Sequence, residues 1–221
     1  MKDETVNRLT GLTGAAGALL FFAGDMLFYG HWGSGAKFHD GMLQVLREGS
    51  WQRLFVGGLV GPIAACLCLI GCWHVRRNVI SRSPFLGRVA FFALAATMVI
   101  GSAVHALWVP RGLAMKYSNA IAGVAPELIA ALKDYWYFAY QMAEVPAYVA
   151  AILLLILVLW GKTRYPLWTV FANFGVLSLL APLAEWVPSP FGAVLVGGFT
   201  NLSVALFFFV SVVSTWKDAS A

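Results

Sequence analysis

The long apolar runs of this chain constrain its fold more than any other feature. A helix needs about 20 apolar residues to cross a bilayer. Six stretches of the 221-residue sequence meet that length: residues 11–30, 54–74, 86–109, 136–160, 166–187 and 191–214. Hydrocarbon leaves no water to pair with the backbone, so such runs fold as helices. The sequence predicts an all-α fold, a polytopic membrane helical bundle of six transmembrane helices, as a single domain over residues 1–221.

The composition and the first run agree with an integral membrane protein. Only 11% of the residues are charged and 60% are hydrophobic, whereas soluble domains carry about 25% charged residues. The net charge of +5 indicates no nucleic-acid partner, because the basic residues lie in short loops between apolar runs. The first run continues to Gly30, so we expect a retained span rather than a cleaved signal peptide. Membrane lipids are the expected surroundings, and the sequence does not define an oligomeric state.

Three cysteines, Cys66, Cys68 and Cys72, lie within one apolar run. This placement argues against a disulfide framework and against a structural zinc site, which needs more ligands nearby. We interpret them as small apolar residues that fill space within a helix.

The loop charges predict an orientation with both termini inside. On that assignment, nine Lys and Arg residues lie in cytoplasmic segments: Lys2, Arg8, Arg76, Arg77, Arg82, Arg88, Lys162, Arg164 and Lys217. Six lie in outer segments: Lys37, Arg47, Arg53, Arg111, Lys116 and Lys133. The densest cluster is HVRRNVISRSPFLGR, residues 74–88, in a short loop where an excess of Lys and Arg is most informative.

The two long connections, residues 31–53 and 110–135, then both lie outside. Phe38, Met42, Leu46 and Trp51 recur near helical spacing, which predicts a short interfacial helix. In the second connection, Pro126 suits the first position of a helix that runs into the fourth span. We expect these connections to cap the outer end of the bundle.

Ionisable residues inside membrane spans are costly and are functional-site candidates by default. Asp25, His105, Glu144 and Glu185 all fall in the outer half of their spans, although the helices alternate in direction. On the helical rise, Asp25 lies about 7–8 Å and Glu144 about 12 Å from the outer ends of their helices. His74, at the inner end of the second span, is interpreted as an interfacial residue.

Neighbouring residues support a polar pocket that opens outward. Tyr29 follows Asp25 at i+4, and Tyr140, Gln141 and Tyr148 share a broad face with Glu144. Pro146 and Pro182 lie close to Glu144 and Glu185, and a proline inside a span frees a carbonyl and kinks the helix. Many aromatic residues accompany the acids and would shape an apolar pocket: Phe28, Tyr29, Trp32, Trp108, Tyr135, Trp136, Tyr137 and Trp186.

These residues suggest acid–base chemistry on an apolar lipid or isoprenoid-like substrate, by isomerisation or cyclisation. A buried carboxyl group can transfer a proton, and aromatic faces stabilise the resulting cation. The catalytic candidates are Asp25, Glu144, His105 and Glu185. The candidates for substrate binding are Tyr29, His31, Trp32, Trp108, Tyr140, Gln141, Trp186 and Asn201.

Several other interpretations of the same residues stay open. Each carboxylate could be interhelical glue, and Glu185 could reach interfacial water. We expect no cofactor, although a metal held by His105, Asp25 and Glu144, with His31 as a further ligand, is an alternative. A proton-coupled transporter or a ligand-binding membrane protein is the alternative function. No lysine lies deep in a span, so a retinal protein is excluded.

The motif GDMLFYG at residues 24–30, followed by WQRLFVGGLVGP at 51–62, resembles a family of small bacterial six-helix membrane proteins of uncharacterised function. GSAVHALWVP at 101–110 and AEVP at 143–146 extend the likeness less clearly. The resemblance implies a location in the bacterial inner membrane and carries over no activity. The pocket is similar only by distant analogy to emopamil-binding sterol isomerases and membrane terpene cyclases, which are also small helical membrane enzymes with buried acids.

Overall fold

The computed structural model describes residues 3–79, 82–118 and 126–216, and every regular element in these ranges is helical. The longer helices are α1 (Asp3–Tyr29), α2 (Phe38–Glu48), α3 (Trp51–Val79), α4 (Pro84–Tyr117), α5 (Pro126–Leu159) and α7 (Gly192–Ser214). The short ones are η1 (Gly35–Lys37), η2 (Leu167–Ala172), α6 (Phe174–Ser178) and η3 (Ala181–Trp186). The prediction of an all-α fold is confirmed for the described residues. Lys2 and Lys217, used in predicting the orientation, and residues 119–125 of the second connection lie outside them.

Within the described residues, five helices (α1, α3, α4, α5 and α7) are long and apolar enough to cross a membrane, so the chain is a multi-pass membrane protein. Helices α4 and α5 have 34 residues each, or about 50 Å on the helical rise. That length exceeds the roughly 30 Å of bilayer hydrocarbon. Residues 110–117, which were expected in a loop, extend α4 through Pro110. The helix that begins at Pro126 runs into the predicted fourth span, as expected.

The fifth predicted span is the main difference from expectation. Residues 166–187 form no single helix but the three short helices η2, α6 and η3. Asn173 interrupts the run because its backbone is extended and its side chain caps α6, accepting from the backbone nitrogens of Gly175 and Val176. Pro182 lies inside η3 and cannot donate a helical hydrogen bond. In contrast, α5 continues as one helix through Pro146.

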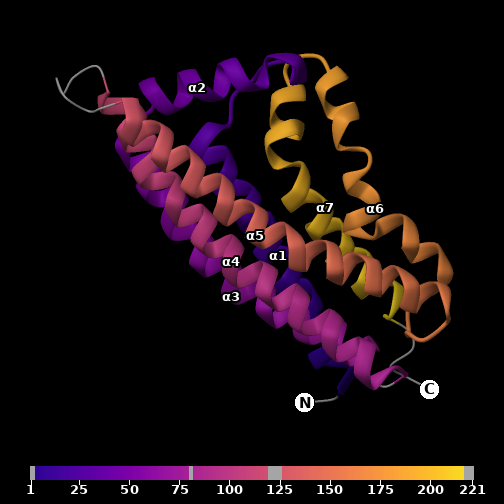
Figure 1. Ribbon diagram of the computed structural model, residues 1–221. Helices are drawn as coiled ribbons and strands as arrows, with labels where there is room; N and C mark the ends of the chain where they lie inside the picture. Colours follow the sequence, from indigo (N-terminus) through magenta and orange to yellow (C-terminus); the bar gives the residue numbers. More distant parts are fainter. Residues whose placement is uncertain (1–2, 80–81, 119–125, 217–221) are drawn as a thin grey trace.

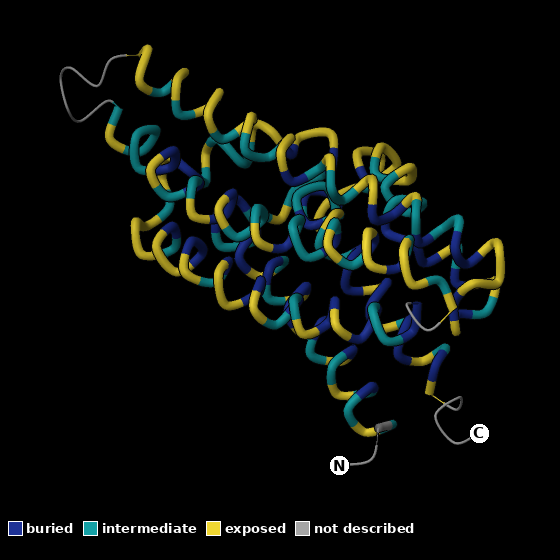
Figure 2. The backbone as a smooth tube through the Cα atoms, turned by 60° about the horizontal axis from the view of Figure 1, so that its bottom comes forward, coloured by how far each residue is buried: buried dark blue, intermediate teal, exposed yellow. Residues whose placement is uncertain are grey.

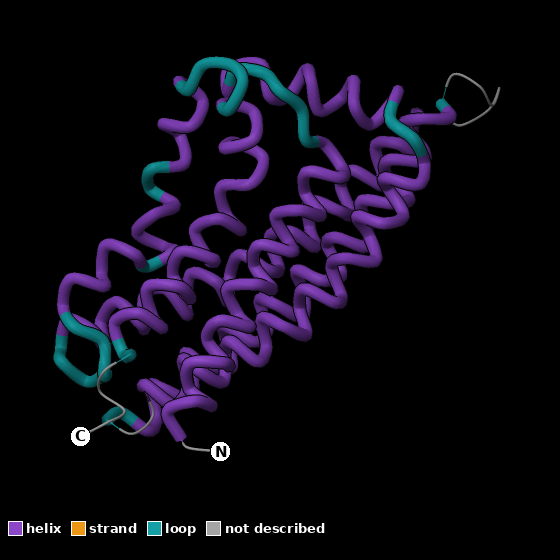
Figure 3. The backbone as a smooth tube through the Cα atoms, turned by 180° about the vertical axis from the view of Figure 1, so that it is seen from behind, coloured by secondary structure: helices purple, strands orange, loops and turns teal. Residues whose placement is uncertain are grey.

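Two clusters of contacts define the ends of the bundle. At one end, here called the terminal end, the Arg8 side chain near the start of α1 donates to the Trp216 carbonyl just after α7, at 2.8 Å. At the other, the cap end, α2 lies across the tips of α1, α4 and α7 (Figures 1 and 3). Residues 166–187 connect these ends, because Arg164 N donates to Asn78 O of α3, and Gly35 N donates to Val187 O.

Helix α1 packs between α3 and α7, and α4 packs between α3 and α5. Small residues allow the closest approach, which is the usual device where lipid removes the hydrophobic drive for helix association. A Cβ atom on Gly14 of α1 would lie 2.6 Å from the Gly71 Cα of α3. The buried faces of these helices turn toward one another and the exposed faces turn outward (Figure 2).

The terminal half of the bundle is filled by a continuous apolar core. Its fully buried members come from α1, α3, α4, α5 and α7 and include Ala18, Cys68, Leu94, Leu154, Leu157 and Phe208. Cys68 and Cys72 are buried here, as expected of apolar filling residues, whereas Cys66 is exposed.

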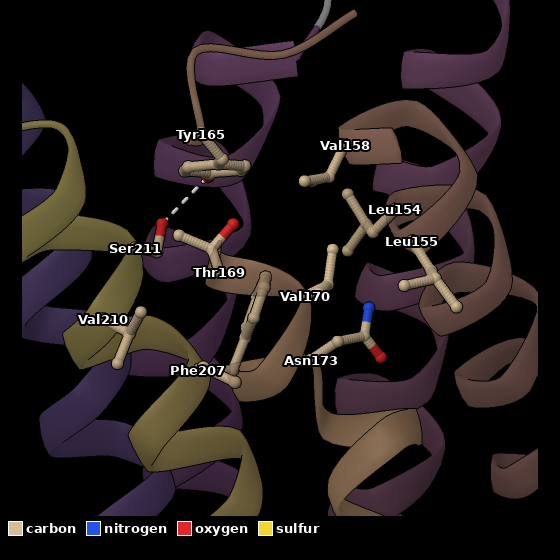
Figure 4. A pocket seen from close by; sticks show the side chains of 11 residues that line it. Leu154, Leu155, Val158, Tyr165, Thr169, Val170, Asn173, Phe207, Val210 and Ser211 are labelled. Atoms are coloured by element: carbon tan, nitrogen blue, oxygen red, sulfur yellow. Dashed lines mark hydrogen bonds between the residues drawn. The ribbon is translucent and has the colours of Figure 1, made fainter. Parts of the chain in front are cut away.

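One polar cluster crosses this terminal half, with His74 at its centre. His74 lies five residues before the end of α3 and is fully buried within the bundle, and its level in the membrane stays a prediction. Its Nδ1 donates to the Asn7 carbonyl at 2.8 Å, and its Nε2 lies 2.8 Å from the Ser211 hydroxyl. The Ser211 and Tyr165 hydroxyl oxygens in turn lie 2.8 Å apart, a hydrogen bond drawn as a dashed line in Figure 4. Burial raises the pKa of Tyr165 well above its usual range. The cluster joins α1, α3, α7 and the loop after α5 through satisfied hydrogen bonds, which is a structural role.

The cap end is closed by α2, as the spacing of its apolar residues predicts. Phe38 and Leu46 of α2 are buried against the bundle. Phe38 packs edge-on against Tyr29 of α1, with ring centroids 5.7 Å apart. Arg53 ties the neighbouring turn to the end of α1, donating to the carbonyls of Leu27 and Met26 at 3.1 and 2.9 Å.

Candidate functional site

A cavity of about 710 Å³ lies between α1, α4, α5 and α7, beneath α2. It exists because α5 packs along α4 while α7 packs along α1, and the two pairs diverge toward the cap end (Figure 1). Its α4 wall is one helix face, formed at helical spacing by Met98, Gly101, Val104, His105, Trp108, Arg111 and Met115. The adjoining wall on α5 runs from Ile129 to Tyr148.

Asp25 of α1 is the most buried acid of the cavity, with 7% of its surface exposed. Asn201 of α7 donates its Nδ2 hydrogen to Asp25 Oδ2 at 2.6 Å. His105 of α4 places its Nε2 3.4 Å from the other carboxyl oxygen, Oδ1. Three helices that are far apart in the sequence therefore converge on one carboxyl group.

Glycines and aromatic rings hold the His105 imidazole in this position. A Cβ atom on Gly61 of α3 would lie 2.5 Å from the His105 Cβ, and one on Gly24 of α1 would lie 3.0 Å from its Cε1. Phe21 and Phe28 flank the ring, with centroids 4.8 and 5.5 Å away. The imidazole therefore has little freedom to leave Asp25.

Tyr29 lies one turn after Asp25 on α1 and is buried. Its hydroxyl donates to the Gly197 carbonyl of α7 at 3.2 Å and also lies against the Asp25 carboxyl. Its ring centroid is 5.2 Å from that of Trp108. Tyr29 thus links the acid to the aromatic wall above it.

Glu144 approaches the cavity from α5, on the wall facing α7. Tyr140, one turn earlier, lies beside Glu144 and interacts with Thr200 of α7. Glu144 is half-buried rather than enclosed. The cavity thus holds two acids in different surroundings: Asp25 enclosed and paired, and Glu144 nearer the surface.

Toward the cap end the cavity becomes cationic. Arg111 of α4 lies between two indole rings, with its guanidinium carbon 4.4 Å from the Trp108 centroid and 4.6 Å from the Trp136 centroid. Lys133 of α5 and His39 of α2 line the same end.

The family comparison covers nearly the whole molecule: the model of a family of unknown function, DUF6796, matches residues 1–218. The chain belongs to DUF6796. Among curated proteins and among solved structures, nothing matches the chain. Family membership therefore assigns no activity, and the site of this DUF6796 chain has to be interpreted from its own geometry.

Seven of the predicted site residues line the cavity: Asp25, His105, Glu144, Tyr29, Trp108, Tyr140 and Asn201. Their catalytic and binding roles stay predictions. The other five lie elsewhere. Glu185 and Trp186 are exposed in η3, Trp32 is 73% exposed and Gln141 is exposed on α5. His31 does not line the cavity and places its Nδ1 3.1 Å from the Tyr29 carbonyl oxygen.

Two physical reasons explain why three of these five residues, Glu185, Trp186 and Gln141, lie outside the cavity. Glu185 and Trp186 were positioned on a continuous helix that residues 166–187 do not form. Gln141 lies one residue after Tyr140, which on a helix is about 100° away and here faces outward.

The alternative metal site is not formed. In the described part of the chain, no three His, Cys, Asp or Glu residues come close enough together to hold a metal ion. Asp25 and His105 are adjacent, but Glu144 stays on the far wall and His31 lies outside the cavity.

Sequence reasoning missed the cationic end. The sequence places Arg111 in the connection 110–135, after the predicted span 86–109, yet α4 continues through Pro110 and Arg111 to Tyr117. The spacing in the sequence could have indicated it. His105, Trp108, Arg111 and Met115 follow one another at intervals of three and four residues, which place them on one helix face.

Proposed function

We propose that this protein is an intramembrane enzyme that performs acid–base chemistry on an apolar lipid or isoprenoid-like substrate, with Asp25 as the group that transfers the proton. The observation that carries the proposal is the enclosed Asp25 carboxyl, held by Asn201 and His105 at the wall of a largely apolar cavity. An acid inside the membrane is costly, and the cavity beside Asp25 is large enough to hold a lipid chain with which the acid could react.

The proposed reaction is an isomerisation or a cyclisation initiated by protonation. Protonated Asp25 donates its hydrogen to an alkene carbon, and the adjacent carbon becomes cationic. Loss of a proton from a neighbouring carbon back to the carboxylate then moves the double bond and restores the acid. In a cyclisation, attack by a second alkene precedes that loss. Positioned proton transfer of this kind contributes about 10²–10⁴-fold to a rate.

The surrounding side chains suit this chemistry. Tyr29, Trp108 and Tyr140 present aromatic rings to the cavity, and ring faces attract a cation. His105 and Asn201 keep the carboxyl group oriented while it changes protonation state. Glu144, on the far wall, is a second group that could accept a proton from the substrate.

We propose that the substrate enters sideways from the bilayer, between α5 and α7. Tyr148 of α5 and Thr200 of α7 both line the cavity and both are exposed on the surface of the bundle. An opening at this level would face lipid chains rather than water, which suits a substrate dissolved in the membrane.

We further propose six crossings, with both ends of the chain in the cytoplasm and a location in a bacterial inner membrane. The broken segment 166–187 would supply the sixth crossing, because it connects opposite ends of the bundle. Broken helices are tolerated at membrane depth where they pack on protein, and Asn173 donates to the Ala151 carbonyl of α5 at 3.0 Å. The loop charges and the family resemblance support the orientation and location.

Transport is the second candidate function, and the packing disfavours it. A transport path must reach both faces, but the terminal half below the cavity is occupied by the buried apolar core around Leu94, Leu154 and Phe208. Substrate flux into proteoliposomes would favour transport. Binding without either flux or turnover would favour a ligand-binding protein.

Solvent deuterium provides the direct test, because each protonation at Asp25 transfers a solvent-derived hydrogen to carbon. The purified protein is placed in nanodiscs made from the total lipid extract of the expression host and incubated in D₂O. Mass spectrometry then follows carbon-bound deuterium in the lipids. We expect time-dependent incorporation into one lipid class, which empty nanodiscs do not show. Absence of incorporation above that control would contradict an acid–base enzyme.

A further inference from the structure

We propose that Arg111 binds the anionic headgroup of an amphiphilic substrate, an oxyanion such as a phosphate ester, at the cap end of the cavity. This inference rests on the proposed function and extends it, because it names the class of substrate: a lipid with an anionic headgroup rather than a neutral hydrocarbon.

Arg111 carries a buried and unpaired charge. Only 9% of its surface is exposed. Among the described residues, its Nη1 has no hydrogen-bond partner and no carboxylate forms an ion pair with it. A buried cation without a hydrogen-bonded counter-charge is strongly destabilising. A cost of this kind is explained if an anion completes the site when the substrate is bound.

Aromatic rings and a second cation surround the Arg111 guanidinium. The Trp108 and Trp136 rings hold the guanidinium carbon at 4.4 and 4.6 Å, which fixes its position without neutralising its charge. The buried indole Nε1 of Trp136 also has no hydrogen-bond partner among the described residues. Lys133 precedes Trp136 by three residues on α5 and lines the same end of the cavity. Two side chains with unsatisfied donors, Arg111 and Trp136, and the cation Lys133 therefore line one end of the cavity, which suits an oxyanion.

The cationic, acidic and apolar groups follow one another along the cavity. Arg111 lies six residues after His105 on α4, or about 9 Å along the helix axis. Met98 lies seven residues before His105, about 10 Å in the other direction. A substrate anchored at Arg111 would therefore place part of its chain beside Asp25. The rest of the chain would extend toward the apolar end formed by Phe21, Met98 and Val204.

The test compares probes that share a chain and differ in the headgroup. The full-length protein in dodecyl maltoside is titrated with dodecyl phosphate, with uncharged dodecanol and with inorganic phosphate alone, and tryptophan fluorescence reports binding near Trp108 and Trp136. We expect dodecyl phosphate to bind at least about tenfold more tightly than dodecanol, as one charge-assisted hydrogen bond allows. Inorganic phosphate at millimolar concentration should not displace it, because the chain supplies the remaining affinity.

Variants assign the preference to Arg111. Arg111→Met should remove the preference for dodecyl phosphate, while Arg111→Lys should retain part of it because the charge stays. The matched control is Arg47→Met, which removes an exposed arginine of α2 at the same end of the bundle and should change nothing. Gel filtration establishes that each variant is folded. If Arg111→Met does not fold, Arg111→Lys still tests the site.

The outcomes separate this inference from the proposed function. Equal binding of dodecyl phosphate and dodecanol, a preference that survives in Arg111→Met, or displacement by inorganic phosphate alone would each overturn the headgroup site. Asp25→Asn should keep the preference for dodecyl phosphate while losing deuterium transfer. If Asp25→Asn still transfers deuterium, the proposed chemistry fails and the headgroup site stands. If the headgroup preference is absent but Asp25→Asn loses deuterium transfer, the headgroup site fails and the proposed chemistry stands.

Discussion

Asp25 is stabilised by residues that only the folded chain brings to it. Asn201 is 176 residues away in the sequence and lies 2.6 Å from the carboxyl group. Helix direction and depth suffice to predict that Asp25, His105 and Glu144 lie at a similar level of the bundle. They do not predict which pairs touch, because rotation about each helix axis is set by packing. That is why Asp25 and His105 form a pair while Glu144 lies on another wall.

The glycine facing His105 provides a residue-scale prediction. Gly61→Ala places a Cβ atom 2.5 Å from the His105 Cβ, so the imidazole or α4 has to shift. We expect a loss of about 1–3 kcal/mol in the free energy of unfolding, as overpacking typically costs, together with slower deuterium incorporation. Unfolding titrations in mixed detergent and the D₂O assay measure the two effects.

Gly101→Ala is the matched control, because Gly101 also lines the cavity from a helix and has no atom within 4 Å of an added Cβ. It should leave turnover unchanged and should not lower stability, because alanine favours a helix interior over glycine. Equal effects of the two substitutions would show that the close approach at Gly61 does not position His105.

At the scale of elements, the sequence predicts the long helices well and the segment 166–187 poorly. Its apolar length is sufficient for a span, but Asn173 supplies a cap that begins a new helix. A capping asparagine stabilises a helix start in water or in protein alike. The length of an apolar run therefore predicts that the segment lies in the membrane, but it does not predict that the segment forms one unbroken helix. The same limitation explains Arg111, since Pro110 marks a helix end by propensity and the packed α4 continues through it.

Asn173 allows a prediction at this scale. Asn173→Ala removes the cap of α6 and the hydrogen bond to the Ala151 carbonyl of α5. We expect it to lower the free energy of unfolding by about 1–3 kcal/mol, the sum of a lost cap and a carbonyl left unsatisfied. Thermal unfolding in detergent checks this.

Asn173→Ser separates the two contributions, because a serine hydroxyl can still cap α6 but is too short to reach the Ala151 carbonyl. It should fall between wild type and Asn173→Ala. If Asn173→Ala unfolds at the wild-type temperature, the asparagine does not hold the broken segment in place.

At the scale of the whole molecule, the six-crossing topology makes a prediction about access. In a background without Cys66, Cys68 and Cys72, Glu48→Cys at the cap end and Lys162→Cys after α5 should react with a membrane-impermeant maleimide from opposite sides. The two positions flank the two ends of the bundle that residues 166–187 connect. Labelling of intact cells reports the outer face, and labelling after permeabilisation reports both.

We expect Glu48→Cys to react in intact cells and Lys162→Cys only after permeabilisation. Reaction of both from the outside would contradict a bundle whose two ends lie on opposite faces of the membrane. If only Lys162→Cys reacts in intact cells, the two ends of the bundle still lie on opposite faces, but the orientation is the reverse of the one that the loop charges predict.

Proton transfer from Asp25 to a lipid is tested by one comparison of three proteins in D₂O. Carbon-bound deuterium is measured in lipids exposed in D₂O to the wild-type protein, to Asp25→Asn and to the control Glu185→Gln, which changes an exposed acid outside the cavity. The asparagine keeps the size of the side chain and a partner for His105 but has no transferable acidic proton. We predict that Asp25→Asn lowers incorporation at least about 100-fold, the contribution of a positioned acid, and that Glu185→Gln matches wild type. Incorporation at the wild-type rate in a folded Asp25→Asn protein would contradict the account.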